Sequence, residues 1–111
     1  MVEDRLFVPL KTEFFKDFLY NGKVYELRTY GRFREKYVYH GRRVELRKGF
    51  SGESVWGAIG DVRIGSLESI LQKVDYRDIE PRTKSRAEFF RETRKIYPDQ
   101  KKFIAFEVKL D

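Results

Sequence analysis

The hydrophobic residues change their spacing along this chain in an order that fits few folds. A spacing of two residues is typical of half-buried strands, and a spacing near 3.6 is typical of helices. The strand spacing occurs in residues 6–11, 23–30, 43–48, 55–64 and 101–110, and the helical spacing occurs in residues 12–21, 66–74 and 85–97. This order lacks the regular strand-helix alternation of a doubly wound fold. It predicts an α+β domain built on a small, mostly antiparallel β-barrel that is flanked by two or three helices.

Local signals refine the shape and the ends of these elements. Three glycines within residues 55–65 predict a bulged and strongly curved strand, and Trp56 in that strand is expected to pack in the core. Thr12 is expected to cap the first helix. Ser85 and Glu88 have the spacing of a capping box, so they predict the start of the last helix.

The composition limits the chemistry that the chain can perform. Its 111 residues suit one domain spanning residues 1–111, and 41% hydrophobic residues supply a core. Because it has no Cys, disulfides, thiolate nucleophiles and sulfur-ligated zinc are excluded, and we expect neither a metal nor a cofactor. A single His excludes a two-histidine ribonuclease pair.

The sequence also predicts a location and a source. No apolar run approaches the ~20 residues of a membrane-spanning helix, and the N-terminus lacks the apolar core of a signal peptide. We therefore expect a cytoplasmic protein without membrane contacts, with the oligomeric state open between a monomer and a weak dimer. One Asn, two Gln and one Met stand beside 11 Lys, 13 Arg and 11 Glu, a composition typical of a thermophilic, archaeal protein.

All of the excess positive charge lies in residues 28–48. The net charge is +6; this segment holds eight Lys and Arg against two Glu, and the other charges balance. Tyr and Phe alternate with the cations, which is typical of proteins that neutralise phosphates and stack on unpaired bases. The alternative is a solvated loop whose aromatic residues belong to the core. The side chains expected to hold an RNA backbone are Arg32, Arg34, Lys36, Tyr37, Arg42 and Arg43.

Three charged residues share one short predicted strand. Alternation places Glu26 and Arg28 on the same face, and Lys23 begins the strand directly after the Asn21-Gly22 turn. An amine, a carboxylate and a guanidinium would then converge on a polar, planar ligand. In this interpretation Glu26 lies in a wet cleft and accepts from an exocyclic amine. The structural alternative is an ion pair across the sheet.

The segment that ends at Arg28 resembles the G-x-K-x-x-E-x-R signature of the ASCH domain, a module of the PUA-like superfamily. Lys23, Glu26 and Arg28 match it, and Asn21 stands where the family has Gly. Residues 96–100, with the strand that follows them, are similar to the end of small bacterial ASCH proteins that hydrolyse N4-acetylcytidine. The resemblance implies a small PUA-like β-barrel with a cleft that binds RNA or a nucleotide.

Three functions follow from these observations. The leading hypothesis is that Lys23, Glu26 and Arg28 bind RNA, a nucleotide or a nucleoside. The second is an amidohydrolase that acts on N4-acylated cytidine, with Lys23 and Glu26 as the catalytic residues. The bacterial enzymes that it would resemble have a Thr in place of Glu26 and use a Glu from the loop before the last helix. The loop expected over residues 75–84 offers Asp75, Asp78 and Glu80.

Hydrolysis ranks below binding because of the protonation state that it requires. A catalytic Lys needs a pKa well below its usual ~10.4, whereas the nearby Glu26 favours the charged ammonium. The pattern is irregular over residues 31–41, which predicts a long loop that carries much of the positive charge; we call it the basic loop. The third hypothesis is a protein-interaction module that docks an acidic partner on this loop and the cations beside it.

Overall fold

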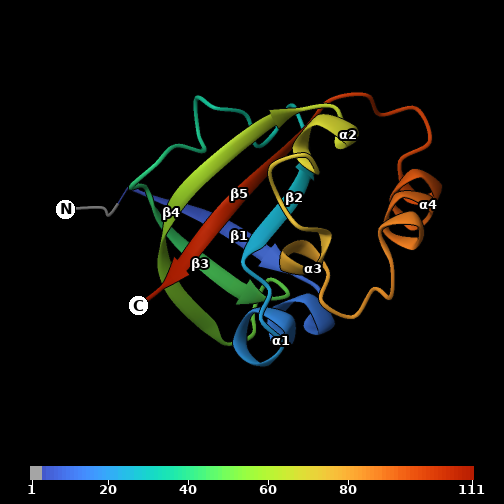
Figure 1. The fold of residues 1–111 in the computed structure, drawn as a ribbon. Helices are drawn as coiled ribbons and strands as arrows, with labels where there is room; N and C mark the ends of the chain where they lie inside the picture. The colour runs from blue at the N-terminus through green and yellow to red at the C-terminus, as the bar shows by residue number, and fades with distance from the viewer. Residues whose placement is uncertain (1–3) are drawn as a thin grey trace.

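Five strands form one curled sheet (Figure 1). They are β1 (Arg5–Leu10), β2 (Tyr25–Thr29), β3 (Arg43–Lys48), β4 (Ser54–Gly65) and β5 (Phe103–Leu110). Their order in the sheet is β1-β3-β4-β5-β2; β1 pairs with β3 in parallel, and all other neighbours are antiparallel. The computed structural model describes residues 4–111. The predicted α+β class and the mostly antiparallel, barrel-like sheet are confirmed.

Within the described residues the chain forms four helices, two of which are single turns. They are α1 (Thr12–Tyr20), α2 (Leu67–Ile70), α3 (Tyr76–Ile79) and α4 (Arg86–Ile96). The number exceeds the expected two or three because α3 lies inside residues 75–84, which were predicted to be a loop. Asp75 begins this turn, since its carboxylate accepts a hydrogen bond from the backbone N–H of Arg77 at 2.9 Å. None of the four is long and apolar enough to cross a membrane.

The two predicted helix starts have different outcomes. The Ser85 hydroxyl accepts from the backbone N–H of Glu88 at 3.1 Å, so the predicted start of α4 is confirmed. Thr12 does not cap α1; it is the first helical residue, and Lys11 occupies the cap position without a side-chain hydrogen bond. The helix begins instead with a backbone bond of 3.0 Å from Phe15 N–H to the Lys11 carbonyl.

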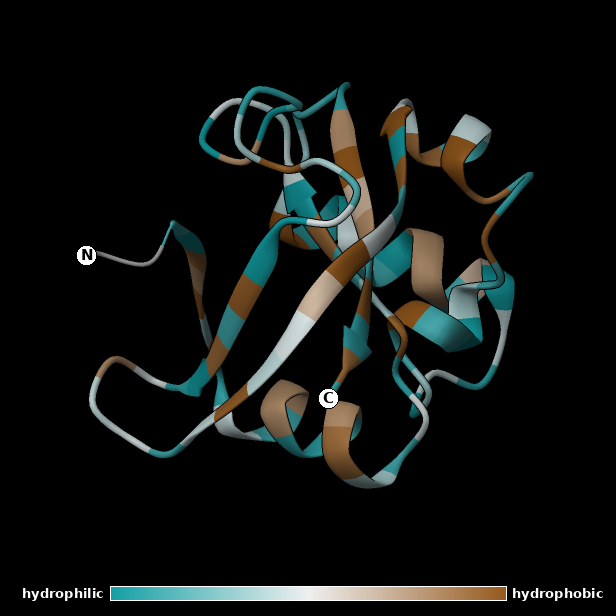
Figure 2. Ribbon diagram, turned by 90° about the vertical axis from the view of Figure 1, so that its left-hand side faces the viewer, coloured by the Kyte–Doolittle hydropathy of each residue, from teal (hydrophilic) through white to brown (hydrophobic). Residues whose placement is uncertain are grey.

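Strand β5 lies between two hydrophobic cores. Ile104, Phe106 and Val108 pack inside the curled sheet, whereas Phe103 and Ala105 pack on the other side with residues of α2, α3 and α4. Figure 2 shows the alternation of hydrophobic and hydrophilic residues along strands of the sheet. This double burial leaves neither face of β5 open to a ligand.

Strand β4 carries the bend that curls the sheet. Its register with β5 shifts between Ile59 and Val62, which marks a bulge. The strands approach so closely at Gly57 that an added Cβ would lie 2.5 Å from the Lys109 carbonyl oxygen. The predicted bulged, curved strand is therefore confirmed.

The sheet curls without closing. Its edge strands are β1 and β2, and in the described part of the chain these two strands do not pair with each other. Arg28 of β2 bridges them, since its Nη2 donates to the Pro9 carbonyl oxygen of β1 at 2.8 Å. We call this gap between Arg5–Leu10 and Tyr25–Thr29 the seam.

Candidate functional site

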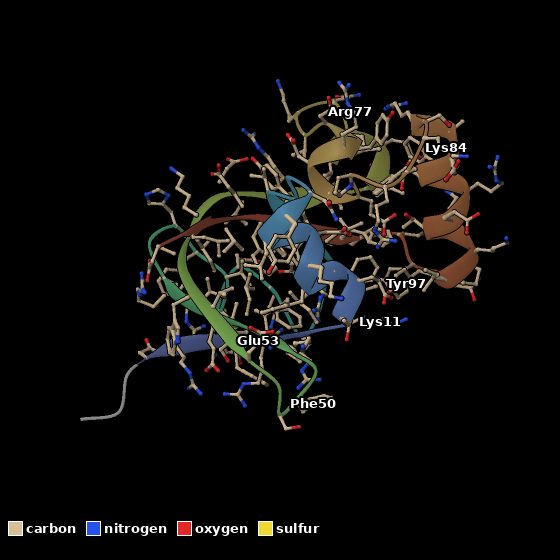
Figure 3. The ribbon with its side chains drawn as sticks, turned by 90° about the horizontal axis from the view of Figure 1, so that it is seen from below. Lys11, Phe50, Glu53, Arg77, Lys84 and Tyr97 are labelled. Atoms are coloured by element: carbon tan, nitrogen blue, oxygen red, sulfur yellow. The ribbon has the colours of Figure 1, made fainter. Side chains whose placement is uncertain are left out.

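A cleft of about 330 Å³ opens at the seam. Its size falls at the lower end of the range of ~300–1,000 Å³ for small-molecule pockets, and its lining mixes apolar walls with a few polar groups, as such pockets do. The charged side chains that line it are Lys11, Lys23, Glu26, Arg28 and Glu80, and the aromatic ones are Phe14, Phe89 and Tyr97. Figure 3 shows Lys11 and Tyr97 near each other, at the start of α1 and at the end of α4.

Lys23 is the most deeply buried charge of the cleft. The chain turns at Gly22, whose φ of 79° favours glycine, and the Lys23 side chain is then directed inward with only 2% of it exposed. Its Nζ donates to the Ile79 carbonyl oxygen at 2.5 Å and lies 3.3 Å from Glu26 Oε1. The Phe18 ring centre is 5.1 Å away. Lys23 is therefore held by the end of α3, by β2 and by α1 together.

Burial controls the charge of Lys23. It lowers the pKa of the ammonium below its usual value, because a low-dielectric surrounding disfavours the charged form. The carboxylates of Glu26, Glu80 and Asp17 oppose this shift, and burial is the larger effect. The Lys23 amine is thus easier to deprotonate than a surface lysine.

Glu26 bridges the two cations of the signature. Its Oε1 faces Lys23, its Oε2 accepts from Arg28 Nε at 2.5 Å, and only 8% of its side chain is exposed. The expectation of a wet environment for Glu26 is therefore wrong, because both oxygens are already paired with buried or half-buried cations. The alternation in the sequence predicts on which face of the strand Glu26 lies, but not how deeply that face is buried.

Arg28 connects the cleft to the neighbouring structure. It binds Glu26 through Nε and Pro9 through Nη2, and its guanidinium lies 4.8 Å from the Phe33 ring centre. The side chain is 24% exposed, so one edge of the guanidinium remains accessible. The predicted convergence of Lys23, Glu26 and Arg28 is what the structure shows.

Of the three acidic residues offered by the segment before α4, Glu80 lines the cleft. Its Oε2 accepts from the Thr83 hydroxyl at 3.1 Å, which leaves Oε1 for another partner. Asp75 is used as the cap of α3 and pairs with Arg77. Asp78 is used through its backbone, since its carbonyl accepts from Val24 N–H at 2.7 Å.

The basic loop forms a second hollow that shares no lining residue with the cleft. This groove, of about 440 Å³, is lined by Leu6, Phe7, Gly31, Arg32, Phe33, Arg34, Tyr37 and Arg42. Figure 1 shows the β2–β3 connection at the side of the sheet opposite α4. Arg32, Arg34 and Lys36 are exposed, and Lys36 lies 5.8 Å from the Tyr37 ring centre.

Arg42 and Arg43 are held by other parts of the protein. Arg42 is 13% exposed and donates to the Tyr37 and Arg5 carbonyl oxygens. Arg43 lies outside the groove and pairs with Asp111 at 2.6 Å. The exposed cations of the basic loop are thus concentrated before Tyr37.

Sequence reasoning missed the contribution of α4 to the cleft. Phe89, Thr93, Ile96 and Tyr97 line it from one face of this helix, which the pattern marked only as a hydrophobic stripe. The polar residue Thr93 within that stripe is the sequence signal that could have distinguished a helix face lining a cleft from a helix face buried in the core. In the part of the chain that the structure describes, no group of three or more His, Asp or Glu is placed to hold a metal ion.

Comparison with solved structures identifies the fold. The hypothetical protein PH0355 matches with a TM-score of 0.76 at 18% identity, covering 96% of this chain and 99% of that protein. Protein PF0455 from Pyrococcus furiosus matches at 0.67 and 20% identity over 96% of each chain. ASCH from Zymomonas mobilis matches at 0.66 and 14% identity, covering 93% of this chain and 65% of that one. No protein-family model matches the sequence, and no curated protein matches it significantly.

These matches place the chain in a structural class. It has the small, single-domain α+β fold of ASCH proteins, the fold that the signature residues predicted.

Proposed function

We propose that the protein binds a nucleotide, free or within single-stranded RNA, with the base in the cleft. The observation that carries this proposal is the Lys23-Glu26-Arg28 network on the floor of a cleft with aromatic walls. Small-molecule sites combine such apolar walls with a few fixed polar groups that orient the ligand. A planar base suits this shape because it stacks on rings and hydrogen-bonds at its edges.

Stability alone gives a weak reason for this network. Removing two charges from water costs several kcal/mol per ion, and apolar side chains of the same volume often stabilise a protein as well or better. Lys23 and Glu26 have side chains only 2% and 8% exposed, so they carry much of this cost. A role in recognition accounts for a charged floor where the neighbouring residues form apolar cores.

In this proposal the groups that remain accessible contact the ligand. Glu80 Oε1 accepts from an exocyclic amine of the base, the role first assigned to Glu26. The accessible edge of Arg28, and Lys11 at the rim, hold a carbonyl oxygen or a phosphate. Lys23 and Glu26 orient Arg28 from below.

The basic loop supports RNA over a free nucleotide. Arg32, Arg34 and Lys36 are exposed beside Tyr37, and in residues 4–111 they form no ion pair that would occupy them. Such a surface neutralises phosphates of a strand whose terminal base lies in the cleft.

A second candidate is hydrolysis of an N4-acylated cytidine, supported by the lowered pKa of Lys23 and by Glu80 in the same cleft. A neutral Lys23 amine would take a proton from water while the hydroxide adds to the amide carbonyl. The C–N bond then breaks, the leaving amine takes the proton from Lys23, and the carboxylic acid and cytidine result. Glu26 opposes this chemistry, because it favours the ammonium form of Lys23.

Calorimetric titration tests the binding proposal. The four nucleoside monophosphates and a short single-stranded RNA are titrated into the wild-type protein, into Arg28→Met and into Lys84→Met, an exposed cation outside the cleft. We expect binding of at least one probe, at least tenfold weaker in Arg28→Met and unchanged in Lys84→Met. No binding of any probe, or equal binding by both variants, would overturn the proposal.

Incubation with N4-acetylcytidine tests the second candidate. Release of cytidine by the wild-type protein, increasing with pH and absent in Lys23→Met, would support it. No release at any pH from about 6 to 10 would remove it.

A further inference from the structure

The groups on the floor of the cleft are already paired with one another. Both oxygens of Glu26 face cations, and the Ile79 and Pro9 carbonyl oxygens accept from Lys23 and Arg28. A ligand would have to displace these contacts to use them. Apart from the accessible edge of Arg28, the groups that select a ligand must therefore come from elsewhere in the cleft.

Thr93 is the polar residue of α4 that faces the cleft. Only 9% of the residue is exposed, yet within the described residues its hydroxyl forms no hydrogen bond to another protein group, not even to the carbonyl of Phe89 one turn before it. The hydroxyl is not among the fully buried atoms without a partner, so it keeps some solvent access. Helical threonines commonly donate to that carbonyl, so a hydroxyl that leaves it unused is available to a ligand. A valine would fill the same volume without leaving a hydroxyl unpaired.

The neighbours of Thr93 on the helix fit a planar ligand. Phe89 and Tyr97 lie four residues before and after it, on the same face, and all three line the cleft. Phe89 is 1% exposed and Tyr97 is 39% exposed, so the stripe runs from the floor to the mouth. A base that enters along this stripe reaches Thr93 between two aromatic residues.

We propose that Thr93 is a specificity-determining residue, whose hydroxyl hydrogen-bonds the edge of the base while Glu80 accepts from the exocyclic amine. This inference rests on the proposed nucleotide site and names the groups that read the base. A hydroxyl both donates and accepts, whereas a carboxylate only accepts. The pair therefore favours bases that carry an exocyclic amine, such as cytosine, over uracil.

The test uses cytidine and uridine 5′-monophosphates with the full chain and three variants, Thr93→Val, Thr93→Ser and Thr29→Val. Thr29, on β2, lies outside the cleft and serves as the matched control. Titration calorimetry measures affinity, and thermal unfolding measures stability.

We expect the wild-type protein to bind cytidine monophosphate more tightly than uridine monophosphate. Thr93→Val should weaken cytidine monophosphate binding about 3- to 10-fold with an equal or higher melting temperature. Thr93→Ser, which keeps the hydroxyl, and Thr29→Val should bind like the wild type.

The opposite results are distinguishable. Normal binding by Thr93→Val overturns the inference and leaves the nucleotide site standing, and a large drop in its melting temperature shows a structural hydroxyl instead. Equal affinity of the wild type for both nucleotides removes the proposed selectivity. If the wild type binds neither nucleotide nor any other monophosphate or RNA, the proposed function and this inference both fall.

Discussion

The tripeptide Glu-Leu-Arg occurs twice in this chain, in two regions with different structural environments. In β2 it is Glu26-Leu27-Arg28, and in β3 it is Glu45-Leu46-Arg47. In each copy the Glu bridges two cations, Lys23 and Arg28 in the first, Arg5 and Arg47 in the second. The local sequence thus builds the same ion-pair unit twice.

The surroundings make the two units different. The Leu of the second copy, Leu46, is fully buried inside the curled sheet, so Glu45 points to the outer face. Its side chain is only 4% exposed there, but its partners Arg5 and Arg47 are 35% and 29% exposed. In the first copy Glu26 faces the seam and pairs with a Lys whose side chain is 2% exposed. A candidate site is therefore defined by a cavity and a buried cation, and not by the tripeptide.

Removing the charge of each glutamate in turn should give the largest difference in unfolding free energy between the two units. Glu26→Gln leaves the buried Lys23 without its nearest carboxylate and should cost about 3–5 kcal/mol of unfolding free energy at pH 7. Glu45→Gln should cost about 1–2 kcal/mol, because water screens the half-exposed arginines that it leaves. Urea denaturation measures both. Equal losses would break the distinction between the two units.

Acid should weaken the outer unit in a defined pH range. Chiefly the Ser54 hydroxyl, with Arg5 and Arg47, lowers the pKa of Glu45 to about 2. This folded-state pKa lies below the unfolded value of ~4.3, so the stabilisation is complete above pH ~4.3 and is lost as the pH falls toward about 2. The stability difference between wild type and Glu45→Gln should shrink by about 1–2 kcal/mol over that range. A constant difference would contradict the assignment.

A rise in pH should also stabilise the inner unit, in the alkaline range. Burial lowers the pKa of Lys23, so between this value and ~10.4 the unfolded chain binds more protons than the folded protein. Stability relative to Lys23→Met should therefore rise as the pH increases from 7 toward 10. Lys84→Met serves as the exposed control and should show no such trend. A difference that stays constant or falls over this range would mean that Lys23 is held charged.

The basic loop should give the smallest effect on stability and a clear effect on binding. Arg32→Ala with Arg34→Ala removes two exposed cations, so the unfolding free energy should change by less than about 0.5 kcal/mol. If each holds one phosphate, the slope of log affinity for single-stranded RNA against log salt should decrease by about 1.4 in magnitude. An unchanged slope would separate the loop from RNA binding and favour a protein partner.

Strand faces and helix stripes were predictable because they depend on local alternation. The face shared by Glu26 and Arg28 follows from a spacing of two, and the inward Val44 and Leu46 follow from the same rule. How deeply each strand face is buried was not predictable, because burial depends on which segment, distant in the sequence, covers that face. Trp56 shows this: it was expected in the core, but it lies half-buried on the outer face with Arg5 near its ring.

The candidate site shows the same division. The signature residues were predicted together, whereas the choice of Glu80 among three acidic residues depends on α3, a single turn too short to produce a periodic pattern. The place of Thr93 in the cleft depends on the packing of α4, which no local rule describes.

The most direct test of the seam as the ligand site is an NMR titration of the ¹⁵N-labelled protein with cytidine 5′-monophosphate. It follows the backbone amides of both Glu-Leu-Arg segments in one experiment. We predict that the amide chemical shifts of Glu26, Arg28 and Thr93 change and saturate at one ligand per protein, while those of Glu45 and Arg47 stay constant. Shifts centred on Glu45 and Arg47, or no saturable shift at the seam with this or any other nucleoside monophosphate, would contradict this prediction.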